Sequence, residues 1–510
     1  MKDKLLVWVG ALCVASVAHA GGRSDGPNLM DRFLENNSSK EVVSKKRSRL
    51  LLSGPDEANT VSTNSKAKTA ECSIAESISP AGNSLVFHDA MLRDSFSFDG
   101  VLEKIVTTSP GFDSVSSELL LEKKNHLINS LLASFNRTEA MNGDVEMSLD
   151  KRPLEAALNS DGDFIRKMKP LGLFNRFDLA SESGNHCGEY RVAFGGELNS
   201  GRFFVIFEAQ YPNPQPAQGL AGCAPVVDFW ASLDALSSEA ALAKLQSFYM
   251  NGIDHKGVSL PAAIDFDHFS AGHGQVRVNA FVTRVWQLRE FRTGLDESGV
   301  DTEFTVDTVK SNPLAELYKS QGSVTKNQQA ADTLRDDFRS DFLLDMLPQL
   351  LAPELKGRTA ARDIINGIRL DNDDKYNEFQ SSSDESDAVR VIAATDFITD
   401  ADINEFLNNA LATDASTDHG ITRDMLLNRA DAMSCGGCHK TTDNRDIAKG
   451  VKWPISAGPF GFVHISEGHT LSPALLEQFL PARKMVMADY ICNAPKAKVN
   501  IWPAIEVLLD

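Results

Sequence analysis

The chain is short of cysteine, of basic charge and of long apolar runs, and each shortage excludes a class of protein. Seven cysteines in 510 residues are too few for a small scaffold held together by disulfides. A mean hydropathy of −0.21 excludes a polytopic membrane protein. The chain has 70 Asp and Glu against 51 Lys and Arg, a net charge of −19. Nucleic acid is therefore not an expected partner, because a polyanion would be repelled.

Several enzyme signatures are also missing. The chain contains no G-x-S-x-G, H-E-x-x-H, G-x-G-x-x-G or P-loop sequence. It also shows no internal repeat, although its length suggests roughly three domains at about 150 residues each. Whether the protein is an enzyme therefore stays open at the level of sequence.

Residues 1–20 match the pattern of a secretory signal peptide. A charged start precedes an uncharged apolar run from Leu5 to Ala18, and an A-x-A cleavage site ends at Ala20. The run is shorter than the ~20 residues that cross a bilayer, so we expect cleavage and no transmembrane segment in the mature chain. The expected location is periplasmic or secreted. Cleavage would remove Cys13 and leave six cysteines in an oxidising compartment.

Composition and periodicity divide the rest of the chain into four segments. Residues 21–84 are rich in Ser, Asn, Lys and Gly, which predicts a flexible linker or pro-segment. Residues 85–320 mix strand-like and amphipathic runs and predict an α+β domain. Residues 321–417 have helical periodicity and predict a helical connector. Residues 418–510 predict a small all-α domain with a tail.

Individual elements are predicted within these segments. Strands are expected at Phe203–Phe207, Val276–Ala280 and Thr283–Leu288, and helices at 115–135, 235–250 and 400–410. Leu334, Phe338 and Phe342 recur every four residues and predict a further helix, which Pro348 is expected to end.

The motif that carries chemistry is Cys435-Gly-Gly-Cys438-His439, the C-x-x-C-H pattern of covalent haem attachment. The two thiols would add across the haem vinyl groups as thioethers, and the imidazole would become the proximal iron ligand. We expect Gly436 and Gly437 to let the backbone pass close to the porphyrin. The predicted cofactor is one covalent haem c.

Three other interpretations of the motif are weaker. A redox C-x-x-C pair would need a thioredoxin-like βαβ context, whereas the residues before the motif have helical character. A zinc site would need a second cysteine or histidine pair at matching spacing. A structural disulfide between Cys435 and Cys438 would leave His439 without a role.

Residues 418–494 resemble a single-haem c-type cytochrome domain. A helical segment from Ile421 to Met433 leads into the motif, an irregular loop follows, and a terminal helical segment begins with Ser472 as its N-cap and Pro473 at its first position. No resemblance is found for the rest of the chain. The resemblance implies a haem held by the two cysteines and His439, one-electron transfer, a periplasmic or secreted location and a redox partner protein.

The distal haem ligand is where the sequence departs from this resemblance. Such domains place a methionine in the loop before the terminal helix, but Met485 and Met487 fall inside the predicted helix and point to different faces. The loop instead contains His464 and His469. We expect His464 to be the second iron ligand, with the two methionines, His469 or an open position as alternatives.

The remaining cysteines and arginines give weaker expectations. Cys187 and Cys223 bracket a predicted strand and are expected to pair, which leaves Cys72 for Cys492. Arginines are scattered over the strand-like region, and ordinary ion pairs are favoured over an anion site for them. These arginines are Arg176, Arg191, Arg202, Arg284, Arg289 and Arg292.

The sequence therefore predicts an exported c-type haem protein: an α+β main domain, a helical connector and a small all-α cytochrome c-like domain that transfers one electron. One alternative is a secreted haem-dependent oxidoreductase whose 85–320 domain acts on a substrate. The other is a non-haem secreted binding or surface protein in which the C-x-x-C is a disulfide. The role of residues 85–320 is not predicted.

Overall fold

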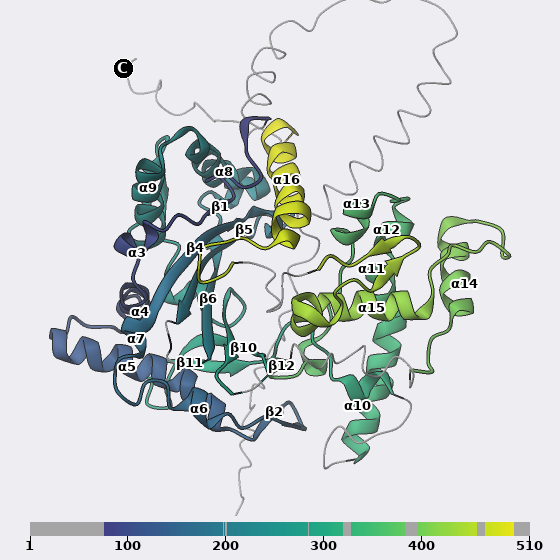
Figure 1. The fold of residues 1–510 in the computed structure, drawn as a ribbon, viewed down its shortest axis with the longest axis horizontal. Helices are drawn as coiled ribbons and strands as arrows, with labels where there is room; N and C mark the ends of the chain where they lie inside the picture. Colours follow the sequence, from purple (N-terminus) through teal and green to yellow (C-terminus); the bar gives the residue numbers. More distant parts are fainter. Residues whose placement is uncertain are drawn as a thin grey trace, which may run out of the picture.

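A central antiparallel sheet organises the protein (Figure 1). The computed structural model describes residues 76–196, 198, 201–283, 285–319, 328–382, 395–455 and 465–493. Within them, seven strands follow the order β1-β4-β5-β6-β9-β10-β11, and β12 pairs with β10. Their bounds are β1 Val86–Phe87, β4 Met168–Arg176, β5 His186–Gly196, β6 Arg202–Pro212, β9 Gln275–Phe281, β10 Gln287–Leu295, β11 Thr302–Asp307 and β12 Ser381–Ser382. Three two-stranded hairpins lie outside the sheet: β2–β3 (Glu139–Asn142, Val145–Ser148), β7–β8 (Ile253–His255, Val258–Leu260) and β13–β14 (Asp446–Ala448, Val451–Lys452).

One face of the sheet is apolar and is covered by helices from the first half of the chain. Alternate residues of the central strands, such as Phe194 and Phe207, point to this face, where Phe98 contacts both rings at centroid distances of 5.1 and 5.8 Å. Tyr190 contacts Phe248 on the same face. The helices of this half are α3 Leu92–Ser95, α4 Phe98–Thr107, α5 Ser117–Ala133, α6 Pro153–Ala156, α7 Phe164–Lys167, α8 Ala224–Ala231 and α9 Ser238–Met250.

A second hydrophobic core is built by the helices that follow the sheet (Figure 1). Phe338 lies at its centre and contacts Tyr318, Phe342 and Tyr376 within 6 Å. The helices are α10 Gln328–Asp341, α11 Leu347–Leu350, α12 Ala352–Leu355, α13 Ala361–Ile365, α14 Asp400–Leu411 and α15 Arg423–Met433. A π-helical turn, Phe342–Met346, joins α10 to α11. The fully buried Arg429 of α15 binds Glu354 through both terminal nitrogens at 2.7 Å, which ties α15 to α12.

The last described helix, α16 (Leu480–Asn493), returns to the sheet. Its Tyr490 packs edge-on against Phe177 at 4.8 Å and donates a hydrogen bond to the carbonyl oxygen of Leu220. Val486 and Met487 belong to the sheet core and not to the core that contains α15. The α+β class is therefore confirmed, but the separate all-α domain expected at 418–510 is not: its terminal helix packs on the sheet.

Most of the elements predicted from periodicity are present. Strands β6 and β9 and helices α5, α9, α14 and α15 cover the expected segments. The strand predicted at Thr283–Leu288 is wrong in its bounds, since β10 begins only at Gln287. Pro348 does not end the helical run, because it occupies the first turn of α11, where its missing N–H costs nothing.

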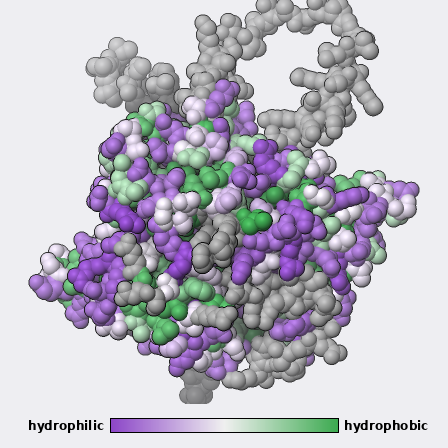
Figure 2. Space-filling model, viewed as in Figure 1, coloured by the Kyte–Doolittle hydropathy of each residue, from purple (hydrophilic) through white to green (hydrophobic). Residues whose placement is uncertain are grey.

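The predicted pairing of Cys187 with Cys223 is confirmed. Cys492 is also disulfide-bonded, while Cys72, its expected partner, lies outside the described residues. No helix among the described residues is long and apolar enough to cross a membrane. Figure 2 shows hydrophilic residues over much of one face, with hydrophobic residues in small separate patches.

Removal of the confirmed disulfide should destabilise the sheet. The bond joins residues separated by 36 positions, so its loss frees a large loop in the unfolded chain. We expect the double variant Cys187→Ala/Cys223→Ala to lose about 2–4 kcal/mol of unfolding free energy in urea titrations. The wild type under reducing conditions should lose at least as much, because the disulfide of Cys492 is then broken as well. Equal urea midpoints for variant and oxidised wild type would contradict this.

Candidate functional site

The C-x-x-C-H motif begins where α15 ends, in a loop held by two side chains. Ser434 caps the turn: its hydroxyl donates to the carbonyl oxygen of Asp431 (2.7 Å) and accepts from the N–H of Gly437 (3.0 Å). The buried carboxylate of Asp431 accepts hydrogen bonds from the hydroxyls of Thr441 (3.0 Å) and Thr442 (2.6 Å). The motif is thus fixed at both ends, and Gly437–Thr441 forms a π-helical turn.

The two glycines of the motif serve close packing within the protein. A Cβ on Gly437 would lie 1.7 Å from the carbonyl oxygen of Asp431, and one on Gly436 would lie 2.4 Å from that of Ser382. The N–H of Gly436 donates to the hydroxyl of Ser381 at 2.9 Å. Both serines belong to β12, so Gly436 lets the motif dock on the edge of the sheet, while Gly437 lets it pack against the end of α15. Both glycines are thus required by contacts within the protein, and their expected role in the close approach of a porphyrin stays a prediction.

His439 points at the sheet. It is 7% exposed, and its Nε2 lies 2.9 Å from the side-chain nitrogen of Asn279 on β9. Its ring also lies 5.9 Å from the ring of Trp286. Burial, and secondarily the charge of Arg202, lowers the pKa of His439 to about 4. The imidazole is therefore neutral at pH 7 and accepts the amide N–H at Nε2, the form and atom with which histidine binds metals.

Cys435 and Cys438 are both free thiols. Burial raises the pKa of Cys435 to about 11, and burial together with Cys435 raises that of Cys438 to about 12. Such thiols stay protonated at pH 7 and are poor nucleophiles for disulfide exchange. Within the described part of the chain, no group of three or more His, Cys, Asp or Glu side chains is placed to hold a metal ion, so a zinc site gains no support.

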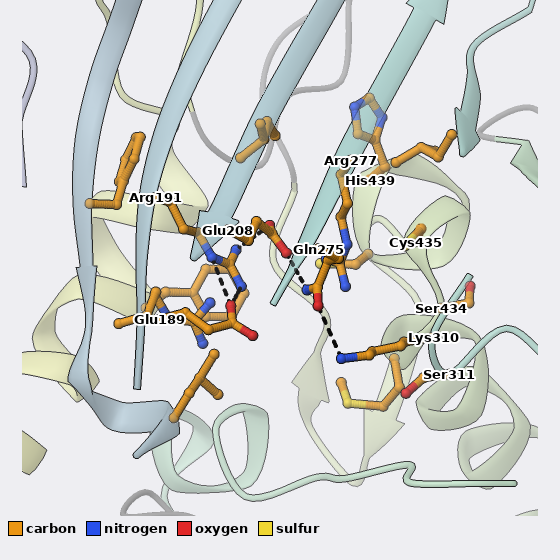
Figure 3. Close-up of a pocket in the computed structure, with 18 of the residues that line it drawn as sticks. Glu189, Arg191, Glu208, Gln275, Arg277, Lys310, Ser311, Ser434, Cys435 and His439 are labelled. Atoms are coloured by element: carbon orange, nitrogen blue, oxygen red, sulfur yellow. Dashed lines mark hydrogen bonds and ion pairs between the residues drawn. The ribbon is translucent and has the colours of Figure 1, made fainter. Parts of the chain in front are cut away.

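The motif lies against a cavity of 460 Å³, between the second face of the sheet and the helices that follow it (Figure 3). This volume is within the range of cofactor sites. Both cysteines and His439 line it. One part of the wall is apolar and the rest is charged. Apolar lining residues come from strands, helices and loops of both halves of the chain: Phe204, Ile206, Leu288, Ile365, Ile368, Trp453, Ile465 and Phe479.

The charged part of the wall is built on the strands, with charges paired across neighbouring strands. Glu208 of β6 is 1% exposed. It forms an ion pair with Arg191 of β5 at 2.9 Å and accepts a hydrogen bond from the side-chain amide of Gln275 of β9 at 2.5 Å. Arg277 of β9 lies 3.4 Å from Glu208 and 3.2 Å from Glu290 of β10. Strand register explains the pairs, because Arg191 lies opposite Glu208 and Arg277 opposite Glu290. Figure 3 shows Arg277 between Glu208 and Cys435.

The arginines named in the sequence analysis separate into two groups. Arg176 and Arg191 line the cavity, where each has a carboxylate partner. Arg202 pairs with Glu467, Arg289 is buried against backbone carbonyls, and Arg292 pairs with Asp307. Arg284 lies outside the described residues. Ion pairs are therefore present as expected, but two of these arginines also belong to a charged cavity wall.

The described candidates for a distal ligand do not line the cavity. His469 is engaged elsewhere, with Nδ1 2.9 Å from the carbonyl oxygen of Leu171. Met487 is 1% exposed in the sheet core, and Met485 packs against the same core. His464, the favoured candidate, lies outside the described residues and stays a prediction.

Sequence reasoning missed Asn279, Lys310 and Arg483, which line the cavity with the motif. A weak signal existed for the strand residues. Glu189 and Arg191, and likewise Gln275, Arg277 and Asn279, alternate at intervals of two, which places each set on one face of its strand. Lys310 and Arg483 have no such pattern, because only the tertiary fold brings them to the cavity.

Comparison with protein-family models, with curated proteins and with solved structures found no match to this chain. The site is therefore interpreted from its own geometry.

The packing of Gly437 can be tested by adding one methyl group. The methyl of Gly437→Ala would collide with backbone at Asp431, so we expect about 3 kcal/mol less stability and faster labelling of the two thiols. Gly468→Ala is the matched control, because the nearest atom to its Cβ is a serine hydroxyl at 3.7 Å; it should change stability by under about 0.5 kcal/mol. Thermal unfolding and thiol labelling of both variants provide the comparison. Equal behaviour would show that the loop has room to move.

Proposed function

We propose that this protein is an exported c-type haem protein that transfers single electrons through one covalently attached haem. The observation that carries the proposal is the convergence of Cys435, Cys438 and His439 on one cavity of cofactor size. The free state of both thiols favours this function over a structural disulfide. A single haem stores one electron, so a redox partner protein is part of the proposal. The net charge of −19 favours a partner with a basic docking surface.

The residues around the cavity fit a haem. Cys435 and Cys438 would hold it through thioethers, and His439, neutral and directed into the site, would be the proximal ligand. Asn279 occupies the direction in which the Nε2 lone pair points, so its amide would have to turn away when iron binds. The apolar wall would cover the macrocycle and exclude water, while Asp431 and Ser434 hold the motif in place. When bound, the haem would supply the redox-active iron.

A haem-dependent oxidoreductase is the second candidate. It is favoured by the fact that strands of the 85–320 region and the cysteine motif line the same cavity. A small substrate entering that cavity would meet the haem directly if the iron had an open position.

Covalent attachment is tested by haem staining after denaturing electrophoresis. The protein made in cells that carry out cytochrome c maturation should give a stained band, and Cys435→Ala/Cys438→Ala should give none, because both thioethers are lost. Cys187→Ala/Cys223→Ala, which also removes two cysteines, is the matched control and should stain. A colourless wild-type band would end the haem proposal.

The distal ligand is tested by visible spectroscopy with and without carbon monoxide. If His464 is the ligand, reduced wild type should not bind carbon monoxide, whereas His464→Ala should bind it and change the spectrum, because an iron position opens. His469→Ala is the control and should leave the spectrum unchanged, since that imidazole is bound to Leu171. An unchanged spectrum in His464→Ala would remove this residue from consideration. Carbon monoxide binding by the wild type would favour the oxidoreductase.

A further inference from the structure

The cavity wall carries more positive than negative charge. Six cationic side chains line it but only three carboxylates do. The cations are Arg176, Arg191, Arg277, Lys310, Arg369 and Arg483, and the carboxylates are Asp178, Glu189 and Glu208. Arg277 also pairs with the buried Glu290, which lies outside the lining, so with Glu290 counted the surplus is two positive charges, in a chain whose net charge is −19. Because uncompensated buried charge costs several kcal/mol, the surplus indicates an anionic ligand.

The carboxylates of the wall are already engaged by three of the cations. Asp178 receives Arg176 at 2.9 Å. Glu208 forms ion pairs with Arg191 and Arg277, and Arg191 also forms an ion pair with Glu189 at 2.5 Å. Burial alone would raise the pKa of Glu189, but Arg191 and two other cations hold it at about 2. Asp178, whose pKa is lowered by Arg176 despite its burial, and Glu189 are therefore ionised at pH 7, and the three acids have little capacity left for further cations.

Of the other three cations, Arg369 donates to the backbone carbonyl oxygens of Asn366 and Ile368. Lys310 and Arg483 have no close carboxylate among the described residues. Lys310 donates a hydrogen bond to the side-chain oxygen of Gln275 at 3.0 Å and forms no ion pair there. Arg483 is 6% exposed, and its nearest carboxylate oxygen, Oδ1 of Asp178, lies 4.0 Å away and already accepts a bond from Arg176. No hydrogen bond joins Arg483 to another described side chain. Burial and the charge of Arg176 lower the pKa of Arg483, which is the expected effect of a missing anion.

We propose that Lys310 and Arg483 each bind one of the two propionate carboxylates of the haem. This inference rests on the proposed function, because it concerns the same cavity. A haem c is anchored by thioethers at its vinyl positions and carries its two carboxylates on the other edge of the macrocycle. Lys310 and Arg483 line the same cavity as Cys435 and Cys438, which would anchor the haem. Two carboxylates match the two cations that have no close carboxylate of their own.

The first experiment measures the midpoint potential of the haem-loaded full chain between about pH 5 and 8. Titration of Asp374 would itself change the midpoint potential in this pH range, because burial and Asp307 raise its pKa to about 6. Every chain therefore also carries Asp374→Asn. The charged or titratable groups that act on Arg483 are Arg176, Asp178, Arg191 and Cys438. Asp178 has its pKa held below the usual value, against its burial, by Arg176, and that of Cys438 is about 12.

With its propionates bound to cations, the reference chain should have a potential that does not change over this pH range. In Arg483→Gln the bare propionate has a raised pKa, so the potential should fall as pH rises. At about pH 8 the ratio of ferrous to ferric haem should drop three- to tenfold, or about 30–60 mV for one electron. Arg483→Lys keeps the charge and should behave as the reference.

Each outcome decides one point. A haem-free wild type would overturn both the proposed function and this inference. A stained Arg483→Gln protein whose potential stays flat with pH would overturn the inference alone. So would a reference chain whose potential is flat only when acetate or citrate is added, because the carboxylate at Arg483 would then come from solution.

A second measurement does not depend on the potential. Cys435→Ala/Cys438→Ala is titrated with free protohaem and with its dimethyl ester, which lacks the two negative charges. Protohaem should bind at least tenfold more tightly to this chain, and adding Lys310→Gln should reduce a tenfold difference to about threefold, because Arg483 would still bind the other propionate. Equal affinities for acid and ester would overturn the inference while leaving covalent attachment, tested by staining, intact.

Discussion

The burial of Glu208 at the middle of the sheet is the constraint from which the cavity follows. A carboxylate that is 1% exposed must be matched by cations and hydrogen-bond donors, and the neighbouring strands supply Arg191, Arg277 and Gln275. These groups occupy one face of the sheet, while the other face is apolar. Apolar helices cannot close over such a face without stripping it of solvent or ligand. The helices of the second core therefore leave a cavity there, and the cysteine motif faces it.

The same strand register positions the motif. Phe204, Asn279, Leu288 and Ser381 lie opposite one another on successive strands from β6 to β12. At one end of this row the hydroxyl of Ser381 accepts a hydrogen bond from the N–H of Gly436. Within the row, the side-chain amide of Asn279 forms a hydrogen bond with Nε2 of His439. Sheet pairing thus sets where the imidazole lies. In a small cytochrome domain of the kind that residues 418–494 resemble, two helices would set the position of the imidazole. Here α16 packs on the sheet core and α15 packs on the other core.

The sequence was sufficient where a local rule applied. The spacing of Cys435, Cys438 and His439 identifies the motif, and alternation predicts β6 and β9. The same alternation could have predicted the charged face of the sheet, since Gln275, Arg277 and Asn279 follow one another at intervals of two residues. Lys310 and Arg483 are separated by 173 positions, counted from their numbers, and neither lies in a pattern. Their shared cavity depends on the return of the chain to the sheet after residue 465, which no local rule predicts.

The charge of the wall bears on the proposed redox role. With Glu290 counted among the acids, two surplus positive charges would face two propionates, and the proposed haem pocket would be close to neutral. Without these cations the two propionates would favour ferric iron, which carries one more positive charge than ferrous iron, so the cations would raise the potential. A bis-histidine haem has a lower potential than a His/Met haem, so ligation by His464 would act in the opposite direction. If the protein carries a haem as proposed, its potential would be set by the sheet as much as by the iron ligands, and the large α+β domain would contribute directly to electron transfer.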